Sequence, residues 1–543
     1  MALTKVTYSM IEGSTYSVVD YGADPTGTTD STNALIACSI AVQAAGGGRV
    51  VFPKGTYQVF KQGITYAQFP FELTGLSGIV VDFSEATIQV DPAKNWTGLN
   101  ASLFRFTNCS DIYVIGGNFT SPAVALNGTF TGVEVVSLRG DCRGVTIPYI
   151  RAENALTVVQ SSVPATTAGS RNIWIGTIDA TGCVYAINCA NSGSNMVVDN
   201  LVTNGCGRSF FIYGTSHVKA NIRSKNFKFS ADVGIATITS GYNSINDIEI
   251  NYNNTESSAA ASTGVGVRLA HSFLDGVAGN ISSVRVNLQV NLDGTGMACA
   301  FEYSKDDGSG NPDPTDRGHI MSNIKVSGVV YGTPSFGASV HFGRNGTVFG
   351  SGDSFYQIDL EDLRTLFTTS QSISVERIMP AMKGNLYLNK IQAITDINVW
   401  GGANPATYTS TDTGARLFVS DVTAPNTDAY NSVTGVNGVK TFAASTSPVT
   451  VRQQYAGLVL TNSGAGGTVV YNLPSAVTGL QFGFAQVLGT AMRLDPNGTE
   501  IIRGGGAGKY LELGAVGTSV TITCRVTGVW EIIQSNGTTS FEP

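Results

Sequence analysis

The sequence predicts an all-β protein built as a parallel β-helix, and three observations carry this prediction. Charged residues make up only 13% of the 543 residues, while glycine alone contributes 64, which is typical of many short strands joined by tight turns. Hydrophobic residues at 42% can bury a large core, which argues against disorder. Between about residues 100 and 350, an apolar–X–apolar triplet returns at intervals that suit the coils of a solenoid.

Two sets of triplets mark these coils. In the first set the triplets begin at Ile112, Val145, Ile173, Met196, Val218, Ile248, Val284 and Ile324. Successive starts lie 33, 28, 23, 22, 30, 36 and 40 residues apart, and loops of variable length between the strands account for the drift. A second set begins at Val267, Phe301 and Val340, with intervals of 34 and 39 residues that follow those of the first set. The two sets are therefore expected to form two faces of one solenoid.

The first 60 residues contain the most specific pattern in the chain. A short strand at Ser17–Asp20 leads into a turn rich in Gly and Pro, and Asp30 can then cap a helix that runs to about Ala45. Three glycines from Gly46 onward end this helix, and a new strand begins at Arg49.

The stretch Tyr16–Tyr57 strongly resembles the N-terminal signature of the pectate-lyase-like right-handed β-helix family found in phage tailspikes. The resemblance implies that the helix plugs the open end of the β-helix, where the first coil would otherwise expose its core and strand edges. Thr4–Gly13 resembles the segment that leads into the spike body in phage tail proteins, and Leu494–Leu513 resembles their compact C-terminal β-domains.

This resemblance also implies a role and a set of partners. The chain is expected to be a homotrimeric spike in the virion tail, attached to a tail or baseplate protein through its N-terminus. Its expected ligand is a bacterial surface polysaccharide, either a capsule or an O-antigen. Outward apolar residues such as Trp174 and Val197 could be covered by packing three copies side by side.

The expected organisation has five parts. These are a lead-in at 1–15, an N-terminal cap at 16–60 with its helix at 30–45, a β-helix at 61–400, a connector at 401–449 and a C-terminal β-domain at 450–543. The last part is expected to be a β-sandwich that serves trimerisation or carbohydrate binding.

Several classes of protein are excluded by charge and composition. The net charge is −7 and no long basic run occurs, so nucleic acid is not an expected partner. No signal peptide and no apolar stretch long enough to span a bilayer are visible, which predicts no membrane insertion. The 8 cysteines lack CxxC spacing, so we expect buried reduced thiols and neither a zinc site nor a disulfide framework. No metal and no cofactor are predicted.

The main candidate site comes from the second set of triplets. Their middle residues, Arg268, Glu302 and His341, should point outward from one sheet and stand in a column. Glu302 would then lie between two cations, which favours its ionised form. An ionised carboxylate suits a nucleophile, a water-activating base or a stabiliser of an oxocarbenium-like transition state.

A glycosidase also needs a carboxylic acid that keeps its proton. Asp306 and Asp307 are adjacent like charges just beyond the strand, and such crowding can raise one pKa. His271 and Asp275, expected in the loop after the preceding strand, complete the site together with aromatic residues that can stack on sugar rings. The predicted substrate-binding residues are Arg268, His341, His271, Asp275, Tyr213, Tyr242 and Trp174.

A rival catalytic pair comes from the first set of triplets. Asp247 and Glu249 should point the same way on one strand, roughly 7 Å apart, which is near the separation that glycosidases use. Lys219, Arg285 and Lys325 would flank them on neighbouring coils. Both columns have an alternative interpretation, because polar rows also keep the outer face of a solenoid soluble and in register.

Three functions remain open at this level. Hydrolysis of the glycan through Glu302 with Asp306 or Asp307 is favoured. A polysaccharide lyase would instead use a base such as His beside cations that neutralise a uronate, and Arg268, His341 and Lys305 are available for this. The third possibility is a non-catalytic receptor-binding fibre, because a fold does not determine a reaction.

Overall fold

The computed structural model divides the chain into two compact units, Met1–Asp313 and Pro314–Pro543. It describes residues 14–61, 69–94, 100–123, 131–162, 169–190, 193–226, 234–240, 244–255, 265–272, 279–292, 299–306, 318–332, 338–343, 353–366, 371–375, 378, 382–393, 397–398, 416–423, 439–441, 447–451 and 459–543. The predicted lead-in lies almost entirely outside these ranges.

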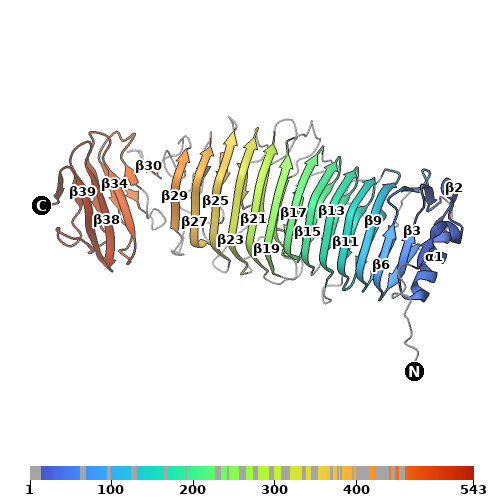
Figure 1. The fold of residues 1–543 in the computed structure, drawn as a ribbon. Coiled ribbons are helices and arrows are strands. Elements are labelled where there is room, and N and C mark those ends of the chain that lie inside the picture. The colour runs from blue at the N-terminus through green and yellow to red at the C-terminus, as the bar shows by residue number, and fades with distance from the viewer. Residues whose placement is uncertain are drawn as a thin grey trace, which may run out of the picture. The chain divides into compact units, whose positions relative to one another are not determined.

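The predicted capping helix is confirmed as α1, Thr32–Ala45, near the N-terminal end of the first unit (Figure 1). It begins two residues later than expected, because Ser31 occupies the N-cap and Asp30 precedes it. The Asp30 carboxylate accepts hydrogen bonds from the backbone N–H and the hydroxyl of Thr32, at 3.1 and 2.6 Å. Gly46 ends the helix in the left-handed region, with φ 83°, a conformation that glycine adopts without steric cost.

The turn before the helix is organised around one carboxylate. Both oxygens of Asp24 accept hydrogen bonds from backbone N–H and hydroxyl groups of Thr26, Thr28 and Thr29, at 2.7 to 3.2 Å. These bonds, led by the Thr26 hydroxyl, hold the pKa of Asp24 well below its usual range. The Gly-Ala-Asp-Pro-Thr-Gly sequence is thus a turn that one ionised side chain holds together.

The first unit confirms the predicted parallel β-helix, with two long sheets whose strands alternate along the chain (Figure 1). After its first short strands, sheet A contains β9 Ser110–Thr120, β11 Arg143–Glu153, β13 Arg171–Thr181, β15 Ser194–Asn204, β17 Ser216–Lys225, β19 Ile245–Asn254 and β21 Asn280–Asn291. Sheet B contains β5 Phe71–Thr74, β8 Asn100–Thr107, β10 Gly132–Arg139, β12 Thr157–Ser162, β14 Tyr185–Ala190, β16 Arg208–Tyr213, β18 Gly234–Thr239, β20 Val265–Ser272 and β22 Cys299–Asp306. Each coil therefore contributes one strand to each sheet.

The predicted triplets of the first set lie in register on sheet A. Val145 pairs with both Ile112 and Ile173, and the register continues through Met196, Val218, Ile248 and Val284. These side chains are buried. In the second set, Val267 pairs with Phe301 on sheet B, which confirms that the two sets form different sheets.

A sharp corner precedes each triplet of sheet A. The residue just before the triplet has a positive φ in successive coils, namely Asp111, Gly144, Asn172, Asn195, His217, Asp247 and Ser283. Asn, Asp and Gly are the residues that tolerate this conformation best.

The second unit contains further parallel strands and a C-terminal pair of sheets. Its parallel strands are β23 Ile320–Tyr331, β25 Ser354–Leu366, β27 Met382–Ala393 and β29 Arg416–Thr423 in one sheet, with β24 Ala338–Phe342, β26 Gln371–Ser374 and β28 Ile397–Asn398 in the other. Because β29 pairs in parallel with β27, this sheet extends into the segment expected to be a connector.

The C-terminal strands form two facing sheets, in agreement with the predicted sandwich-like domain. One contains β30 Val439–Thr441, β32 Val459–Thr461, β34 Gln481–Ala485, β38 Ser519–Val526, β39 Val529–Asn536 and β36 Ile501–Ile502. The other contains β31 Val449–Thr450, β33 Val469–Asn472, β35 Met492–Asp495, β37 Leu511–Leu513 and β40 Thr539–Phe541. Tyr471 and Phe484, one from each sheet, pack edge to face with ring centroids 5.5 Å apart.

All eight cysteines are free and buried, as expected. Burial raises the pKa of Cys38 and of Cys189 to about 12. Several thiols stand at the turns between the sheets, where Cys109 and Cys142 donate to the backbone oxygens of Leu73 and Phe106 on the preceding coil. Within the described ranges, no helix is both long and apolar enough to cross a membrane.

Candidate functional site

The outer face of sheet B carries a row of polar side chains in cross-strand register. From β5 to β22 the row runs through Glu72, Arg105, Ser137, Gln160, Asn188, Phe211, Thr237, Arg268 and Glu302. Neighbouring strands lie ~4.8 Å apart, so these side chains follow one another without interruption along the β-helix. We refer to this set as the sheet-B row.

Arg268 on β20 and Glu302 on β22 are the last two members of the sheet-B row. Both the Nε and an Nη nitrogen of Arg268 contact one oxygen of Glu302, at 3.1 and 2.9 Å, so the predicted pairing is confirmed. Both side chains lie on the outer face as predicted, but they are enclosed there, since Arg268 is 3% and Glu302 is 2% exposed. Strand alternation identifies the side of the sheet on which a residue lies, but it does not reveal what covers that side. All of β18 is likewise buried.

A second group lies on the opposite face of the same two strands. His271 belongs to β20 rather than to the loop that was expected, and its Nδ1 is hydrogen-bonded to the Tyr303 hydroxyl at 2.7 Å. Lys305 pairs in register with His271. None of these three residues is exposed to solvent. Two adjacent strands thus enclose several ionisable groups, an arrangement found at functional sites and also in structural ion-pair networks.

The remaining predicted members of this site are placed only in part. Asp306 ends β22, but its side chain lies outside the described residues. Asp275, Tyr242 and Asp307 also lie outside them. His341 belongs to the second unit, where it is 5% exposed on β24 and pairs in register with Ser374. The structure therefore brings together Arg268 and Glu302, while the roles assigned to the other residues stay predictions.

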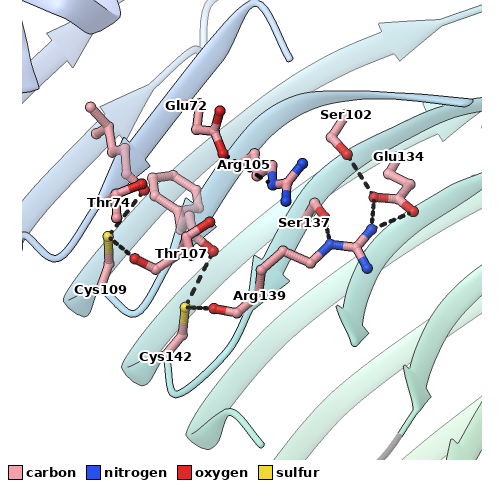
Figure 2. A network of polar contacts seen from close by, with 12 residues as sticks. Glu72, Thr74, Ser102, Arg105, Thr107, Cys109, Glu134, Ser137, Arg139 and Cys142 are labelled. Carbon is pink, nitrogen blue, oxygen red and sulfur yellow. Dashed lines mark hydrogen bonds and ion pairs between the residues drawn. The ribbon is translucent and has the colours of Figure 1, made fainter. Parts of the chain in front are cut away.

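The sequence analysis missed an arginine–glutamate cluster at the other end of the sheet-B row (Figure 2). Arg139 on β10 donates to both oxygens of Glu134, at 2.9 and 2.7 Å, and its Nε donates to Ser137 at 2.9 Å. Ser102 on β8 donates to Glu134 at 2.7 Å. Every one of these groups comes from the outer face of sheet B.

This cluster reaches solvent, unlike the pair at the other end. The side chain of Arg139 is 26% exposed and that of Glu134 is 10% exposed. Arg105 and Glu72 form a neighbouring ion pair at 3.2 Å (Figure 2), and the Arg105 guanidinium lies 3.9 Å from the centre of the Phe69 ring. Extending the second set of triplets toward the N-terminus would have located this cluster, but the variable loops hide that spacing in the sequence.

Aromatic side chains occupy the middle of the sheet-B row. The rings of Tyr185 and Phe211 pack edge to face with centroids 6.2 Å apart, and Arg208 lies 5.8 and 5.1 Å from those two rings. Burial raises the pKa of the Tyr185 hydroxyl, while the positive charge of Arg208 acts against that shift. Phe211 and Tyr213 flank the inward Ile212, as expected, although Tyr213 is 8% exposed and therefore enclosed.

Trp174 does not belong to this face. It lies on β13 of sheet A and is 39% exposed. The prediction that Trp174 and Tyr213 serve one site is therefore wrong, since the two side chains stand on different sheets.

The rival carboxylates of β19 pair with different residues of the preceding coil. Asp247 is a corner residue with φ 56°, and one of its oxygens lies 3.1 Å from Nδ1 of His217, the corner residue of the preceding coil. Glu249 stands on the flat part of the strand and pairs with Lys219 at 3.1 Å. Both carboxylates are thus ion-paired to the neighbouring strand, and their assignment as a catalytic pair stays a prediction. These exposed cross-strand pairs are typical of a solvated surface.

Lys325 forms a comparable ion pair with Glu361 in the second unit. Among the described residues, no group of three or more His, Cys, Asp or Glu side chains is placed to hold a metal ion.

Comparison with known proteins returned structural neighbours only. The tailspike protein of E. coli bacteriophage HK620, in complex with a pentasaccharide, is 12% identical, with a TM-score of 0.42, over 97% of this chain and 92% of that chain. An exopolygalacturonase from Thermotoga maritima is 11% identical, with a TM-score of 0.38, over 71% and 91% of the two chains. The A-module of mannuronan C-5 epimerase AlgE4 from Azotobacter vinelandii is 16% identical, with a TM-score of 0.34, over 65% and 97%.

No protein-family model and no curated protein matches the chain. Since each of the three TM-scores lies below 0.5, the fold described above rests on the strand pairing of this chain itself.

Proposed function

We propose that the chain binds and cleaves a bacterial surface polysaccharide along the outer face of sheet B. The observation that carries this proposal is the sheet-B row, which places carboxylate, guanidinium, amide and hydroxyl groups in register over nine strands. Four of its members, Glu72, Arg105, Asn188 and Phe211, are partly exposed, and the other five are buried. Sugar hydroxyls form hydrogen bonds with groups of these kinds, and the face of a sugar ring stacks on aromatic rings such as Phe211. A row that continues from coil to coil suits a polymer better than a small molecule.

Hydrolysis is the reaction that this row supports best. Glycosidases use one carboxylate that is ionised and one carboxylic acid that is protonated. Arg268 favours the ionised form of Glu302 through direct contact at 2.9 Å, and Asp306 or Asp307 is the proposed acid. Because Glu302 is 2% exposed, cleavage there requires that polymer binding displaces the atoms that cover it.

Glu134 is the competing carboxylate. Its side chain is 10% exposed and lies beside Arg139 at the open end of the sheet-B row. A substrate can reach Arg139, whose side chain is 26% exposed, whereas both oxygens of Glu134 already accept hydrogen bonds. Replacing Glu302 and Glu134 one at a time, and measuring cleavage by each variant, shows which of the two carboxylates acts in catalysis.

A lyase reaction is the second candidate, and one contact favours it. The hydrogen bond between His271 and Tyr303, at 2.7 Å, places two possible bases near Lys305, a cation that could neutralise a uronate, on the face of these strands opposite to Arg268. Elimination leaves an unsaturated sugar that absorbs ultraviolet light, whereas hydrolysis leaves a reducing end without that absorbance.

The oligomer and its attachment form part of the same proposal. We propose a homotrimeric tail spike whose C-terminal domain contributes to trimerisation, since Val516, Val526 and Ile533 expose 61%, 57% and 42% of their surface there. Attachment to a tail or baseplate protein through the N-terminal segment rests on the resemblance of Thr4–Gly13 alone.

The deciding experiment incubates the purified protein with capsule and O-antigen polysaccharides from a panel of bacteria. Polymer size, reducing ends and ultraviolet absorbance are then measured. Shortening of one glycan supports the proposal, and the absorbance identifies the reaction. Binding without any shortening would leave a receptor-binding fibre and refute cleavage.

Matched variants then locate the chemistry. Glu302→Gln should lower cleavage by about 10²–10⁴-fold if Glu302 acts in acid–base or nucleophilic catalysis, with polymer binding retained. Glu134→Gln provides the same test at the open end, and Glu249→Gln on sheet A is the control for loss of an ion-paired carboxylate. Full activity of Glu302→Gln together with ultraviolet-absorbing products would assign a lyase.

A further inference from the structure

The outer face of sheet A carries exposed apolar side chains on four consecutive strands. Tyr113 on β9, Tyr149 on β11, Trp174 on β13 and Val197 on β15 are 39%, 40%, 39% and 36% exposed. We call these four residues the aromatic strip. Tyr113, Trp174 and Val197 share one cross-strand row, which Thr146 completes on β11.

The central member of the strip is held in a defined orientation. The indole Nε1 of Trp174 donates to a carboxylate oxygen of Asp199 on the next strand at 2.9 Å. Its Cη2 atom lies 3.2 Å from the position that a Cβ of Gly176 would occupy, so the ring extends along its own strand over the glycine. A ring that lies over a glycine and is tied at its nitrogen keeps its remaining surface open to solvent.

Hydrogen-bonding groups continue from the strip across the same sheet. Asn221 donates to the backbone oxygen of Asp199 at 3.0 Å, and Asn251 donates to the side-chain oxygen of Asn221 at 2.8 Å. Both amides are partly exposed. An aromatic surface thus adjoins a row of amides, and this combination matches a sugar chain, whose rings have apolar C–H faces and hydroxyl edges.

The size of the strip distinguishes a sugar chain from a second copy of this protein. An enclosed aromatic side chain buries ~150–250 Å², so the exposure observed here leaves roughly 300 Å² over the four residues. A standard protein interface takes about 800 Å² from each partner. On sheet A, the cross-strand row of the aromatic strip continues from Val197 to Lys219 and Glu249, which form an ion pair with each other. The side chains therefore change from apolar to charged at these two residues. The apolar area is therefore short, and an ion-paired surface follows it on the next strands.

We infer that the aromatic strip is a second carbohydrate-binding site, separate from the sheet-B row, in which a sugar ring stacks on Trp174 and the chain continues toward Tyr149 and Asn221. The ligand class rests on the proposed function, whereas the site itself rests on the geometry of sheet A. Such a site holds the polymer without taking part in its cleavage.

The test compares Trp174→Ala and Tyr149→Ala with wild type in a binding assay against immobilised capsule and O-antigen polysaccharides. Each variant should weaken retention of the polymer by about fivefold to tenfold, which is the size expected for one aromatic contact. Trp174→Phe should retain most of the affinity, and Tyr331→Ala, which removes a ring that is 43% exposed on β23 outside the strip, should change it by less than about twofold. Cleavage of short oligosaccharides should be unaffected.

Two results would overturn the inference. Polymer binding that is unchanged in both alanine variants would show that the strip takes no sugar, even if wild type cleaves the glycan. A change of oligomeric mass in Trp174→Ala, measured by light scattering, would show that a second copy covers the strip. Failure of the wild type to bind any of the polysaccharides would instead overturn the proposed function and this site together.

Discussion

The buried pair of Arg268 and Glu302 provides the sharpest test of the structure. Replacing Glu302 with Gln removes the negative charge that contacts the enclosed Arg268 guanidinium. At an effective dielectric constant of ~20, two unit charges ~3 Å apart attract each other by about 5 kcal/mol, and the contacts here are 2.9 and 3.1 Å. Breaking a buried pair at one partner typically costs about 3–5 kcal/mol. Since a glutamine oxygen keeps one hydrogen bond, we expect Glu302→Gln to lower the free energy of unfolding by about 3 kcal/mol.

The double variant Arg268→Leu with Glu302→Leu should be much closer to wild type. Removing both charges also removes the cost of taking them out of water, so such replacements are often neutral or stabilising. The control is the exposed pair of Lys219 and Glu249, whose side chains are 53% and 41% exposed at a separation of 3.1 Å. Loss of Glu249 there should cost no more than about 1 kcal/mol.

The assay is urea unfolding followed by far-ultraviolet circular dichroism, with all variants at one protein concentration. A Glu302→Gln protein that unfolds within about 0.5 kcal/mol of wild type, as the exposed control should, would refute the burial of this carboxylate. Activity comparisons at Glu302 are then made at a temperature where every variant is folded, which separates a loss of chemistry from a loss of structure.

Three further predictions test the cap, the coil packing and the thiols. Asp24→Asn should lower the melting temperature at neutral pH. Since folding depresses the pKa of Asp24, its contribution is present in full above about pH 4 and is lost on further acidification, so parallel melting curves that never converge at low pH would contradict this. Gly117→Ala should lower the free energy of unfolding by about 1–3 kcal/mol, because a Cβ at this position would lie 2.6 Å from the backbone oxygen of Ala86. Gly466→Ala is the control, since a Cβ there would meet nothing within 4 Å, and it should leave the free energy of unfolding unchanged in the same denaturant titration. A coloured disulfide reagent at pH 8 should react with the thiols only after unfolding, because all eight are buried and the reagent needs an accessible thiolate; rapid colour from the folded protein would refute this.

The core of the β-helix could be predicted from the sequence because its signal is local. An inward apolar residue must stand at the same place in every coil, so the triplets from Ile112 to Val284 reveal the register of sheet A directly. The capping helix is equally local, since the Asp30 carboxylate bonds to Thr32 in the first turn and Gly46 ends the helix.

The arrangement of the site was only partly visible in this way. The pairing of Arg268 with Glu302 follows from the register of Val267 with Phe301, because a cross-strand neighbour is determined once the core residues are aligned. The cluster of Glu134 and Arg139 was missed, since loops of unequal length separate β10 from its neighbours and blur the spacing between coils.

Exposure and backbone corners were decided by the tertiary structure alone. Period-2 alternation assigns both Glu302 and Trp174 to outer faces, yet one is 2% and the other 39% exposed, because the two sheets differ in what lies against them. The positive φ of Asp247 within β19 is a backbone feature that the alternation pattern did not reveal. The sequence by itself thus determined which residues form the core and which strands are neighbours, while packing around the coils decided which outward residues meet solvent.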